Sequence, residues 1–388
     1  MSVPRAVPPG QHLPTYAREL VRMHDAVIAG SSSALRPRAV VSRSWSRVLG
    51  LGLKPDGVNT RNWLSEAEID RRRSSSGLRE VVPDLRDIVG SLADASQLLL
   101  VVTDADGVIL WRSGTPAVRC RADRLGFFEG ADWTERQVGT NAIGTALAEA
   151  APVELLAGEH FEQGQHPWYC TATPVHDPRT GALLGVIDVS GPALTLHPAI
   201  GALVETGRLL AESRLWRYHQ ERLERLRGAL TSGPALVVDD HGWVAASHGV
   251  AVGSRIAVPV AGQPIAVPGL GACLPERLGE GWLVRPSSVD RTVTLELDLT
   301  GTPQVRLAGG DADWRRTITR RHAEILVLLH RAGRDGLSAE ALSAALYGDA
   351  EHVVTVRAEV SRLRRLLGAL VETRPYRLSS DVRMNILR

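Results

Sequence analysis

Alternating apolar and polar positions predict paired strands in the first half of the chain. Residues 97–114, QLLLVVTDADGVILWRSG, hold two apolar runs around an Asp- and Gly-rich turn, which is a hairpin pattern. Residues 168–191, WYCTATPVHDPRTGALLGVIDVSG, repeat it. Between them, residues 134–150, TERQVGTNAIGTALAEA, predict one helix with Thr134 as its N-cap. Strands and helices around one sheet predict a compact α+β module.

A seven-residue repeat then predicts a long helix. Its apolar positions are Leu209, Trp216, Leu223 and Leu230. Such a repeat favours two helices that pair along their length. We therefore expect this helix to form a dimer interface, and packing on its own domain is the alternative.

The second half repeats the hairpin pattern and then changes to helices. Residues 235–249, ALVVDDHGWVAASHG, resemble the first hairpin and predict a small β-rich unit, PAS-like in kind, that runs to about residue 290. Two strands follow, in TVTLELDL and PQVRLAGG, and then three helices. PYRLSSDVRMNIL, residues 375–387, is expected to close the chain as a short hairpin.

The third of these helices, VTVRAEVSRLRRLLG, carries an unusual number of arginines. Its apolar residues recur at the helical period and predict one buried stripe: Val356, Val360, Leu363, Leu367 and Leu370. Arg357, Ser361 and Arg364 lie on the flank of that stripe. Burial of the stripe would direct a row of guanidinium and hydroxyl groups away from the core, towards any partner. An ordinary solvated helix face is the simpler interpretation.

Composition limits the function classes. The hydrophobic fraction is 44%, no apolar run approaches the roughly 20 residues of a membrane helix, and the start has no secretory pattern. We expect a cytoplasmic protein without a membrane partner. Lys54 is the only lysine and lies in GLKPD, so no phosphate-binding GK[ST] loop is present, and neither GxSxG nor HExxH occurs. We expect no enzyme activity and no cofactor.

The last hundred residues resemble the C-terminal effector domain of OmpR-type response regulators. That family carries a T-V-x-x-x-x-S-R-L-R pattern that ends in glycine, and then a Y-R-L hairpin. The matching residues are Thr355, Val356, Ser361, Arg362, Leu363, Arg364, Gly368, Tyr376, Arg377 and Leu378. The resemblance implies a winged helix-turn-helix that binds double-stranded DNA.

The resemblance assigns roles to these side chains. Arginine suits bidentate contacts with guanine and phosphate. Arg357, Ser361 and Arg364 are the candidates for the groove-facing side. Thr355, Arg362, Arg365 and Arg377 complete the predicted DNA-binding set, with Arg362 and Arg365 expected at phosphates or in salt bridges.

Residues 35–215 resemble the sensory region of AcoR-type activators, a GAF domain. The similar stretches are SRSWSRVLGLGLKPD, WTERQVGTNAIGTALAE and EHFEQGQHPWYCTATPVHDPRTGALLGVIDVSG. Those activators continue into an ATPase domain. This chain lacks the P-loop lysine, so the resemblance implies a GAF sensor joined to a different DNA-binding domain.

A GAF pocket would hold a small-molecule effector. The expected ligand-binding residues lie in VGTNAIGT and EHFEQGQHPWYC: Thr140, Asn141, Ile143, His160, Phe161, His166, Trp168 and Cys170. Most of them could equally be core or helix-capping residues. A metal or haem site at His160, His166, Cys170 and His176 is a weaker alternative, because the spacing matches no standard motif. A redox thiol at Cys120 or Cys170 is another.

The sequence thus predicts an α+β multidomain, one-component transcription regulator. We expect double-stranded DNA, a small-molecule effector and a second copy of the chain as partners, with RNA polymerase as a further candidate. A signalling adaptor whose winged helix binds protein, a metal- or redox-sensing regulator and a GAF-type enzyme remain the alternatives. The expected parts are a helical region at 1–84, a GAF domain at 85–205, a linker helix at 206–232, a small β-rich domain at 233–290 and a winged helix at 291–388.

Overall fold

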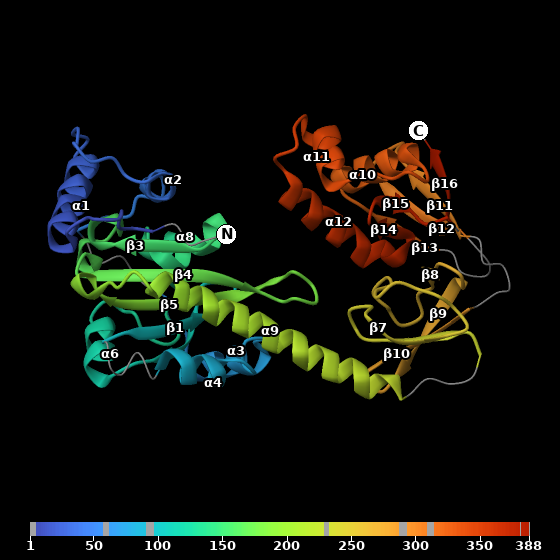
Figure 1. Ribbon diagram of the computed structural model, residues 1–388, viewed down its shortest axis with the longest axis horizontal. Coiled ribbons are helices and arrows are strands. Elements are labelled where there is room, and N and C mark those ends of the chain that lie inside the picture. Colours follow the sequence, from blue (N-terminus) through green and yellow to red (C-terminus); the bar gives the residue numbers. More distant parts are fainter. Residues whose placement is uncertain are drawn as a thin grey trace. The chain divides into compact units, whose positions relative to one another are not determined.

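The computed structural model describes residues 5–56, 62–90, 97–228, 233–286, 293–308, 314–380 and 382–387. The chain divides into two compact units, Met1–Arg217 and Tyr218–Arg388, and each is described by itself. Helices and several sheets alternate along the chain (Figure 1), as the predicted α+β multidomain class requires. Among the helices of the described ranges, none combines the length and apolarity that a membrane span needs.

The first unit contains a five-stranded antiparallel sheet in the order β2-β1-β5-β4-β3. Both predicted hairpins are confirmed, because β1 pairs with β2 and β4 pairs with β5. The apolar strands β1 and β5 lie inside the sheet, where both faces are buried. The strands are β1 Leu99–Thr103, β2 Ile109–Ser113, β3 Val153–Leu156, β4 Trp168–His176 and β5 Leu183–Pro192.

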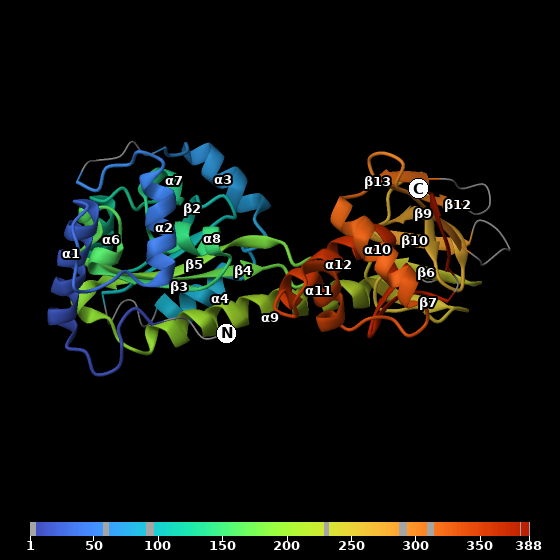
Figure 2. The same cartoon turned by 90° about the horizontal axis from the view of Figure 1, so that it is seen from above.

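Helices cover both faces of this sheet. Figure 2 shows α9 along one face and α2, α7 and α8 on the other. Residues 5–84 contribute helices to the same unit. The helical elements are α1 Leu13–Ile28, α2 Ala39–Leu49, α3 Glu66–Ser75, α4 Val82–Leu85, η1 Arg86–Gly90, α6 Pro116–Asp123, α7 Glu135–Val138, α8 Ala142–Glu149, η2 Ala157–Glu159, η3 Gln163–Gln165, η4 Ala193–Thr195 and α9 Ile200–Arg227.

The single helix predicted over residues 134–150 is wrong, because two helices, α7 and α8, occupy this stretch. Gly139 has a φ of +76°, and a Cβ placed there would lie 2.6 Å from Cδ1 of Phe161. Asn141 then starts a new helix, since its Oδ1 accepts the N–H of Gly144 at 2.9 Å. The ring of Phe161, which follows later in the sequence, thus determines where α7 ends and α8 begins.

Helix α9 carries the seven-residue repeat, and its apolar positions have different surroundings. Leu209 is 53% exposed, whereas Leu223 and Leu226 are buried against the sheet of the second unit. Leu230 lies outside the described residues. Part of the predicted stripe is therefore covered by the chain itself.

The second unit contains the end of α9 and a five-stranded sheet in the order β7-β6-β10-β9-β8. The predicted hairpin of residues 235–249 is confirmed by the pairing of β6 with β7. Its core gathers apolar side chains such as Leu236, Val238 and Val284. The strands are β6 Ala235–Val238, β7 Val244–His248, β8 Ile265–Val267, β9 Gly271–Leu278 and β10 Gly281–Pro286.

A second sheet and three helices complete this unit. The sheet has the order β13-β12-β11-β16, and β14 pairs separately with β15. The helices are α10 Arg320–Ala332, α11 Ala339–Tyr347 and α12 Val353–Leu367, followed by η5 Gly368–Leu370. The strands are β11 Val293–Asp298, β12 Gln304–Ala308, β13 Trp314–Thr317, β14 Val371–Thr373, β15 Tyr376–Leu378 and β16 Val382–Leu387.

The hairpin predicted over residues 375–387 is wrong in its pairing. β15 pairs with the preceding strand β14, and β16 runs parallel to β11, with Leu295 opposite Met384. β16 lies beside β11 because that position buries Met384 in the core of α10–α12. A local pattern of alternation could not reveal a partner about ninety residues earlier in the chain.

Candidate functional site

The helix predicted to contact DNA, α12, buries its apolar stripe as expected. Val356, Val360, Leu363 and Leu367 are at most 2% exposed, and Leu370 follows in η5. They pack with α10 and α11 in one core. This packing fixes which side of α12 faces away from the protein.

The predicted DNA-binding residues of α12 differ in their exposure. Thr355, Arg357 and Arg362 are exposed, whereas Ser361, Arg364 and Arg365 are partly buried. Arg362 forms an ion pair with Glu359 on its own helix. In contrast, Arg357 has no hydrogen bond or ion pair to any residue that the structure describes. Arg357 is therefore the α12 arginine that is most available to a partner.

Arg364 and Arg365 are partly enclosed by the protein. Burial lowers the pKa of Arg364, and its Nε has no hydrogen-bond partner within the described ranges. The carbonyl of Arg365 accepts the N–H of Val258 at 3.1 Å. The C-terminal end of α12 is thus attached to the small β-rich part of the same unit.

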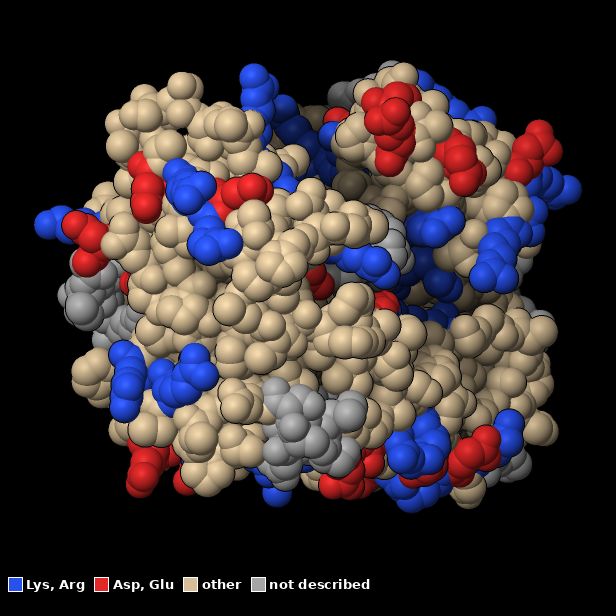
Figure 3. All heavy atoms as spheres, turned by 60° about the vertical axis from the view of Figure 1, so that its left-hand side comes forward, with Lys and Arg blue, Asp and Glu red and all other residues tan. Residues whose placement is uncertain are grey.

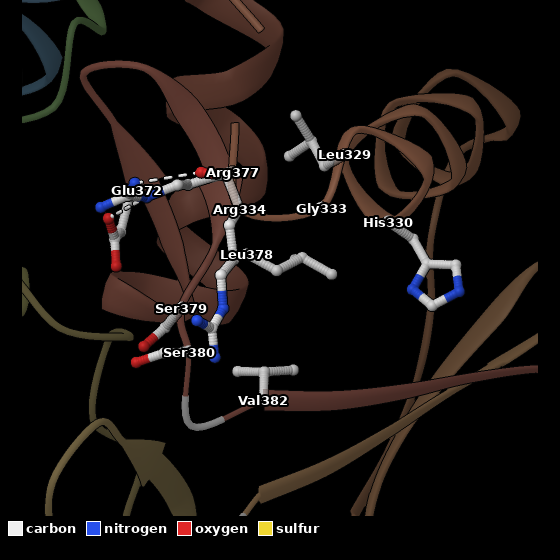
Figure 4. Close-up of a pocket in the computed structure, with 10 residues that line it drawn as sticks. All are labelled: Leu329, His330, Gly333, Arg334, Glu372, Arg377, Leu378, Ser379, Ser380 and Val382. Atoms are coloured by element: carbon white, nitrogen blue, oxygen red, sulfur yellow. Dashed lines mark hydrogen bonds and ion pairs between the residues drawn. The ribbon is translucent and has the colours of Figure 1, made fainter. Parts of the chain in front are cut away.

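Arg377 is held by neighbouring groups. Its Nε lies 2.7 Å from Oε2 of Glu372, and its Nη1 donates to the carbonyl of Arg334 at 3.1 Å. These residues line a cavity of about 480 Å³ between the end of α10 and the β14–β15 hairpin (Figure 4). In the same view the Arg334 side chain extends towards Ser380 and Val382. The basic groups here come from two elements.

Two predicted ligand-binding residues have structural hydrogen bonds. Asn141 caps α8 and donates through Nδ2 to the carbonyl of Gly139 at 2.9 Å. The hydroxyl of Thr140 lies 2.6 Å from Oγ of Ser44, and its carbonyl accepts the N–H of Phe161 at 3.0 Å. Both side chains are at most 1% exposed. Their contact with an effector stays a prediction.

The predicted walls of the effector pocket are buried side chains. Ile143, Phe161 and Trp168 are at most 5% exposed, so they belong to the core of the unit as it stands. Arg121 of α6 lies over the Trp168 ring, with Cζ 5.4 Å from the centroid. Trp168 is therefore the wall residue that adjoins a charged group.

Histidines meet where α1 contacts the segment after β3. The rings of His24 and His166 are 4.7 Å apart, and Nε2 of His24 lies 2.9 Å from the carbonyl of Phe161. Burial lowers the pKa of both His160 and His166 to about 4, so both are neutral at pH 7. Within the described ranges, no group of three or more His, Cys, Asp or Glu side chains is arranged to hold a metal ion.

A buried polar cluster lies on the sheet itself, and the sequence interpretation missed two of its members. Cys170 pairs with Ser190, and Ala172 pairs with Asp188, across β4 and β5. Because paired residues of adjacent strands point to the same face, Cys170, Ser190 and Asp188 share one side of the sheet. Asp188 and Ser190 are fully buried, whereas Cys170 retains some accessible surface. The signal in the sequence was an acidic residue inside the apolar run GVIDVSG.

This cluster faces the helices that include α6. Val101 pairs with both Asp188 and Arg112, so these side chains lie on one face. Nη1 of Arg112 lies 2.8 Å from Oδ1 of Asp123 at the end of α6. The cluster therefore occupies the side of the sheet opposite α9 (Figure 2).

Burial changes the acidity of this cluster. It raises the pKa of Asp188 to about 7, and the hydrogen bond from Ser190 opposes the rise in part. Burial, with a smaller effect of Asp188, raises the pKa of the Cys170 thiol well above its ordinary value. Cys170 is therefore protonated at pH 7, which does not favour a reactive thiolate.

A known sequence family matches within the first unit, and several curated regulators are similar to about half of the chain. Residues 21–212 match the sequence family described as MimR, N-terminal domain. The acetoin dehydrogenase operon transcriptional activator AcoR of Bacillus subtilis is 34% identical over 189 residues, which is 48% of this chain and 31% of AcoR. The propane 2-monooxygenase operon transcriptional activator MimR of Mycolicibacterium smegmatis is 30% identical over 195 residues, 49% of this chain and 32% of MimR. The chain therefore spans about a third of the length of these two activators.

One relative is similar along nearly the whole chain. An uncharacterized 47.3 kDa protein encoded in the thcA 5' region of Rhodococcus erythropolis is 32% identical over 384 residues. The similarity covers 97% of this chain and 72% of that protein.

Proposed function

The chain belongs to the same family as the 47.3 kDa protein of Rhodococcus erythropolis, and from this premise we propose that it is a transcription regulator. Its N-terminal region would sense a small molecule, as a GAF domain does, and its C-terminal region would bind double-stranded DNA as a winged helix. The observation that carries the proposal is the match of residues 21–212 to the N-terminal domain of MimR, together with an arginine-bearing helix in the other unit.

The geometry of α12 supports a role in DNA binding. Its stripe is buried, its opposite side is exposed, and Arg357 has no hydrogen bond or ion pair to a described residue. An α-helix fits the major groove, where arginine can bind guanine in a bidentate manner. Arg357 and Ser361 are proposed to read bases, and Arg362 to contact phosphate. The other three predicted DNA-binding arginines could contact DNA only after their side chains move. Arg364 and Arg365 are partly buried, and Arg377 is bound to Glu372.

The effector is proposed to bind on the sheet face that carries Cys170. This face combines buried apolar walls, such as Trp168, with the polar groups of Asp188 and Ser190. Effector sites are largely apolar with a few polar anchors. Because burial raises the pKa of Asp188 to about 7, its carboxyl group can carry a proton near neutral pH and can then donate as well as accept a hydrogen bond.

A homodimer formed through the first half of α9 is part of the proposal. Leu209 is 53% exposed on this helix, and Trp216 is partly buried. Pairing of two α9 helices would place two DNA-binding parts on a two-part operator. Analytical ultracentrifugation of Leu209→Glu against the unchanged protein tests it, and a protein that is monomeric at all concentrations contradicts it.

The direct test is fluorescence anisotropy of purified protein with DNA from its own upstream intergenic region, across a salt series and with unrelated DNA as competitor. A DNA-binding protein loses affinity steeply as salt rises, because counterions are released on binding. Replacement of both Arg357 and Ser361 by alanine is expected to abolish preference for the specific site. Arg225→Ala, an exposed arginine of α9, is the matched control.

The rival function is a signalling adaptor whose C-terminal unit binds protein. An adaptor of this kind would show no sequence-dependent, salt-sensitive binding to DNA, in contrast to the proposed regulator. Binding that is equal for specific and unrelated DNA, or that does not change in the double alanine variant, would contradict the proposed regulator.

A further inference from the structure

A cavity in the first unit has properties that the proposed sensor face does not share. It has a volume of about 700 Å³ and lies between α1, α6, the segment around Pro167 and the start of η4. Ligand sites for small molecules have about this size. The cavity is thus large enough for a compact organic molecule.

Three arginines line this cavity. Arg18 and Arg22 are four residues apart on α1, and Arg121 comes from α6. Within the described ranges, no carboxylate forms an ion pair with any of them. Arg18 Nη2 lies 3.5 Å from the Thr15 hydroxyl, and the guanidinium of Arg121 lies over the Trp168 ring.

Several other arginines of the chain do have an acidic partner. Arg38, Arg47, Arg72 and Arg208 each lie within 3.0 Å of a carboxylate oxygen. Figure 3 shows basic and acidic side chains next to one another at several places on the surface that it presents. Around this cavity, three guanidinium groups lie together without a carboxylate partner among the described residues, and a bound anion would supply one.

The arrangement carries a small electrostatic cost without an anion. Like charges four residues apart on a helix repel one another and destabilise it. His166 also lines the cavity, but burial holds its pKa at about 4, so it is neutral at pH 7. The positive charge comes from the arginines alone, and a single negative group could contact more than one of them.

The rest of the lining is apolar. Ala17, Ala157 and Ala193 are at most 8% exposed and form buried parts of the wall. Val21 and Leu194 add apolar surface, and Leu194 is 60% exposed. A ligand that matches this lining carries its charge at one end and an apolar body at the other.

We propose that this cavity binds a small organic carboxylate with an apolar body. A carboxylate accepts two hydrogen bonds from a guanidinium fork, and an apolar chain covers the alanine and leucine surface. The proposal concerns ligand binding by the first unit, so it stands or fails separately from DNA binding.

The test is isothermal titration calorimetry of the full-length protein with octanoate, and with octanamide as the neutral analogue of the same shape. Saturable binding of octanoate with at least about tenfold weaker binding of octanamide is expected, because the amide cannot form charge-assisted hydrogen bonds. No saturable binding of octanoate overturns the proposal. Equal binding of octanoate and octanamide also overturns it.

Variants identify the site. Arg18→Gln combined with Arg22→Gln, and separately Arg121→Gln, are expected to weaken octanoate binding about tenfold or more. These side chains are exposed, so the variants should keep the circular dichroism spectrum and melting temperature of the parent. Arg136→Gln, an exposed arginine of α7 outside the cavity, is the matched control and should bind as the parent does.

Two further outcomes decide the chemical class. Octanoate binding that survives in the Arg18→Gln/Arg22→Gln variant places the ligand elsewhere and overturns the site. Inorganic phosphate that competes as strongly as octanoate shows that the apolar body contributes nothing, and it overturns the assignment to an apolar carboxylate.

Discussion

Oγ of Ser190 donates a hydrogen bond of 2.5 Å to Oδ2 of Asp188, inside the sheet of the first unit. Oδ1 of the same carboxyl group has no hydrogen-bond partner among the described residues. An ionised carboxylate with one unsatisfied oxygen is costly in a buried position, so the carboxyl group keeps its proton to a higher pH than an exposed aspartate does. The raised pKa of Asp188 in the folded protein therefore makes the free energy of unfolding depend on pH.

Asp188 is expected to make the protein less stable as pH rises from about 4 to about 7. Its folded-state pKa is about 7, against an ordinary value of 3.8. Below 3.8 both states hold the proton; between the two values only the folded state does, so unfolding becomes easier. Above about 7 the loss is complete, and it amounts to a few kcal/mol at about 1.4 kcal/mol per pKa unit. Urea unfolding across this pH range measures the slope.

Asp188→Asn mimics the protonated group and should remove this part of the slope. Asp87→Asn, at an exposed carboxyl group of η1, is the control and should leave the slope unchanged. Ser190→Ala removes a hydrogen bond that lowers the pKa of Asp188, so the stability loss should extend to higher pH. An Asp188→Asn variant with the parent's slope would show that Asp188 is ionised in the folded protein.

Arg357→Ala is expected to weaken specific DNA binding by roughly 1–3 kcal/mol and to relax the sequence preference, because Arg357 is proposed to contact a base. Arg362→Ala should weaken specific and unrelated DNA equally and lower the salt slope by about one, as for a phosphate contact. Anisotropy titrations with both DNAs measure the two effects. If Arg357→Ala weakened binding to specific and unrelated DNA by the same factor, as expected for Arg362→Ala, Arg357 would not contact a base.

Gly368→Ala is expected to destabilise the second unit by roughly 1–3 kcal/mol or more. Gly368 has a φ of +57°, and a Cβ there would lie 2.0 Å from the backbone nitrogen of Ala257. Both the conformation and the close approach therefore require glycine. Urea unfolding measures the loss. Gly253→Ala is the control, since no atom lies within 4 Å of its added Cβ.

Glu135→Gln should destabilise the first unit by roughly 1–3 kcal/mol, because it removes the buried negative charge that pairs with Arg47. The loss is moderate, since Arg47 is partly exposed and keeps some solvation. Oε2 of Glu135 lies 2.7 Å from Nε of Arg47, and its Oε1 accepts the Ser44 hydroxyl at 2.5 Å. Glu135 is only 7% exposed. Thermal unfolding measures the effect, and Glu68→Gln at an exposed ion pair should cost less. A larger loss in Glu68→Gln would contradict this account.

The sequence by itself determined the elements whose signals are local. The stripe from Val356 to Leu367 lies within one helix, and the three confirmed hairpins each join strands separated by a short turn, so periodicity and turn residues were sufficient. Tertiary structure alone decided the features that need distant partners. Phe161 lies against Gly139 and interrupts the predicted helix. Met384 lies opposite Leu295 because β16 pairs with β11. The pairing of β4 with β5 places Cys170 beside Ser190. The arginine-lined cavity has the same origin, because Arg22 and Arg121 are about a hundred residues apart and meet only when α1 packs beside α6.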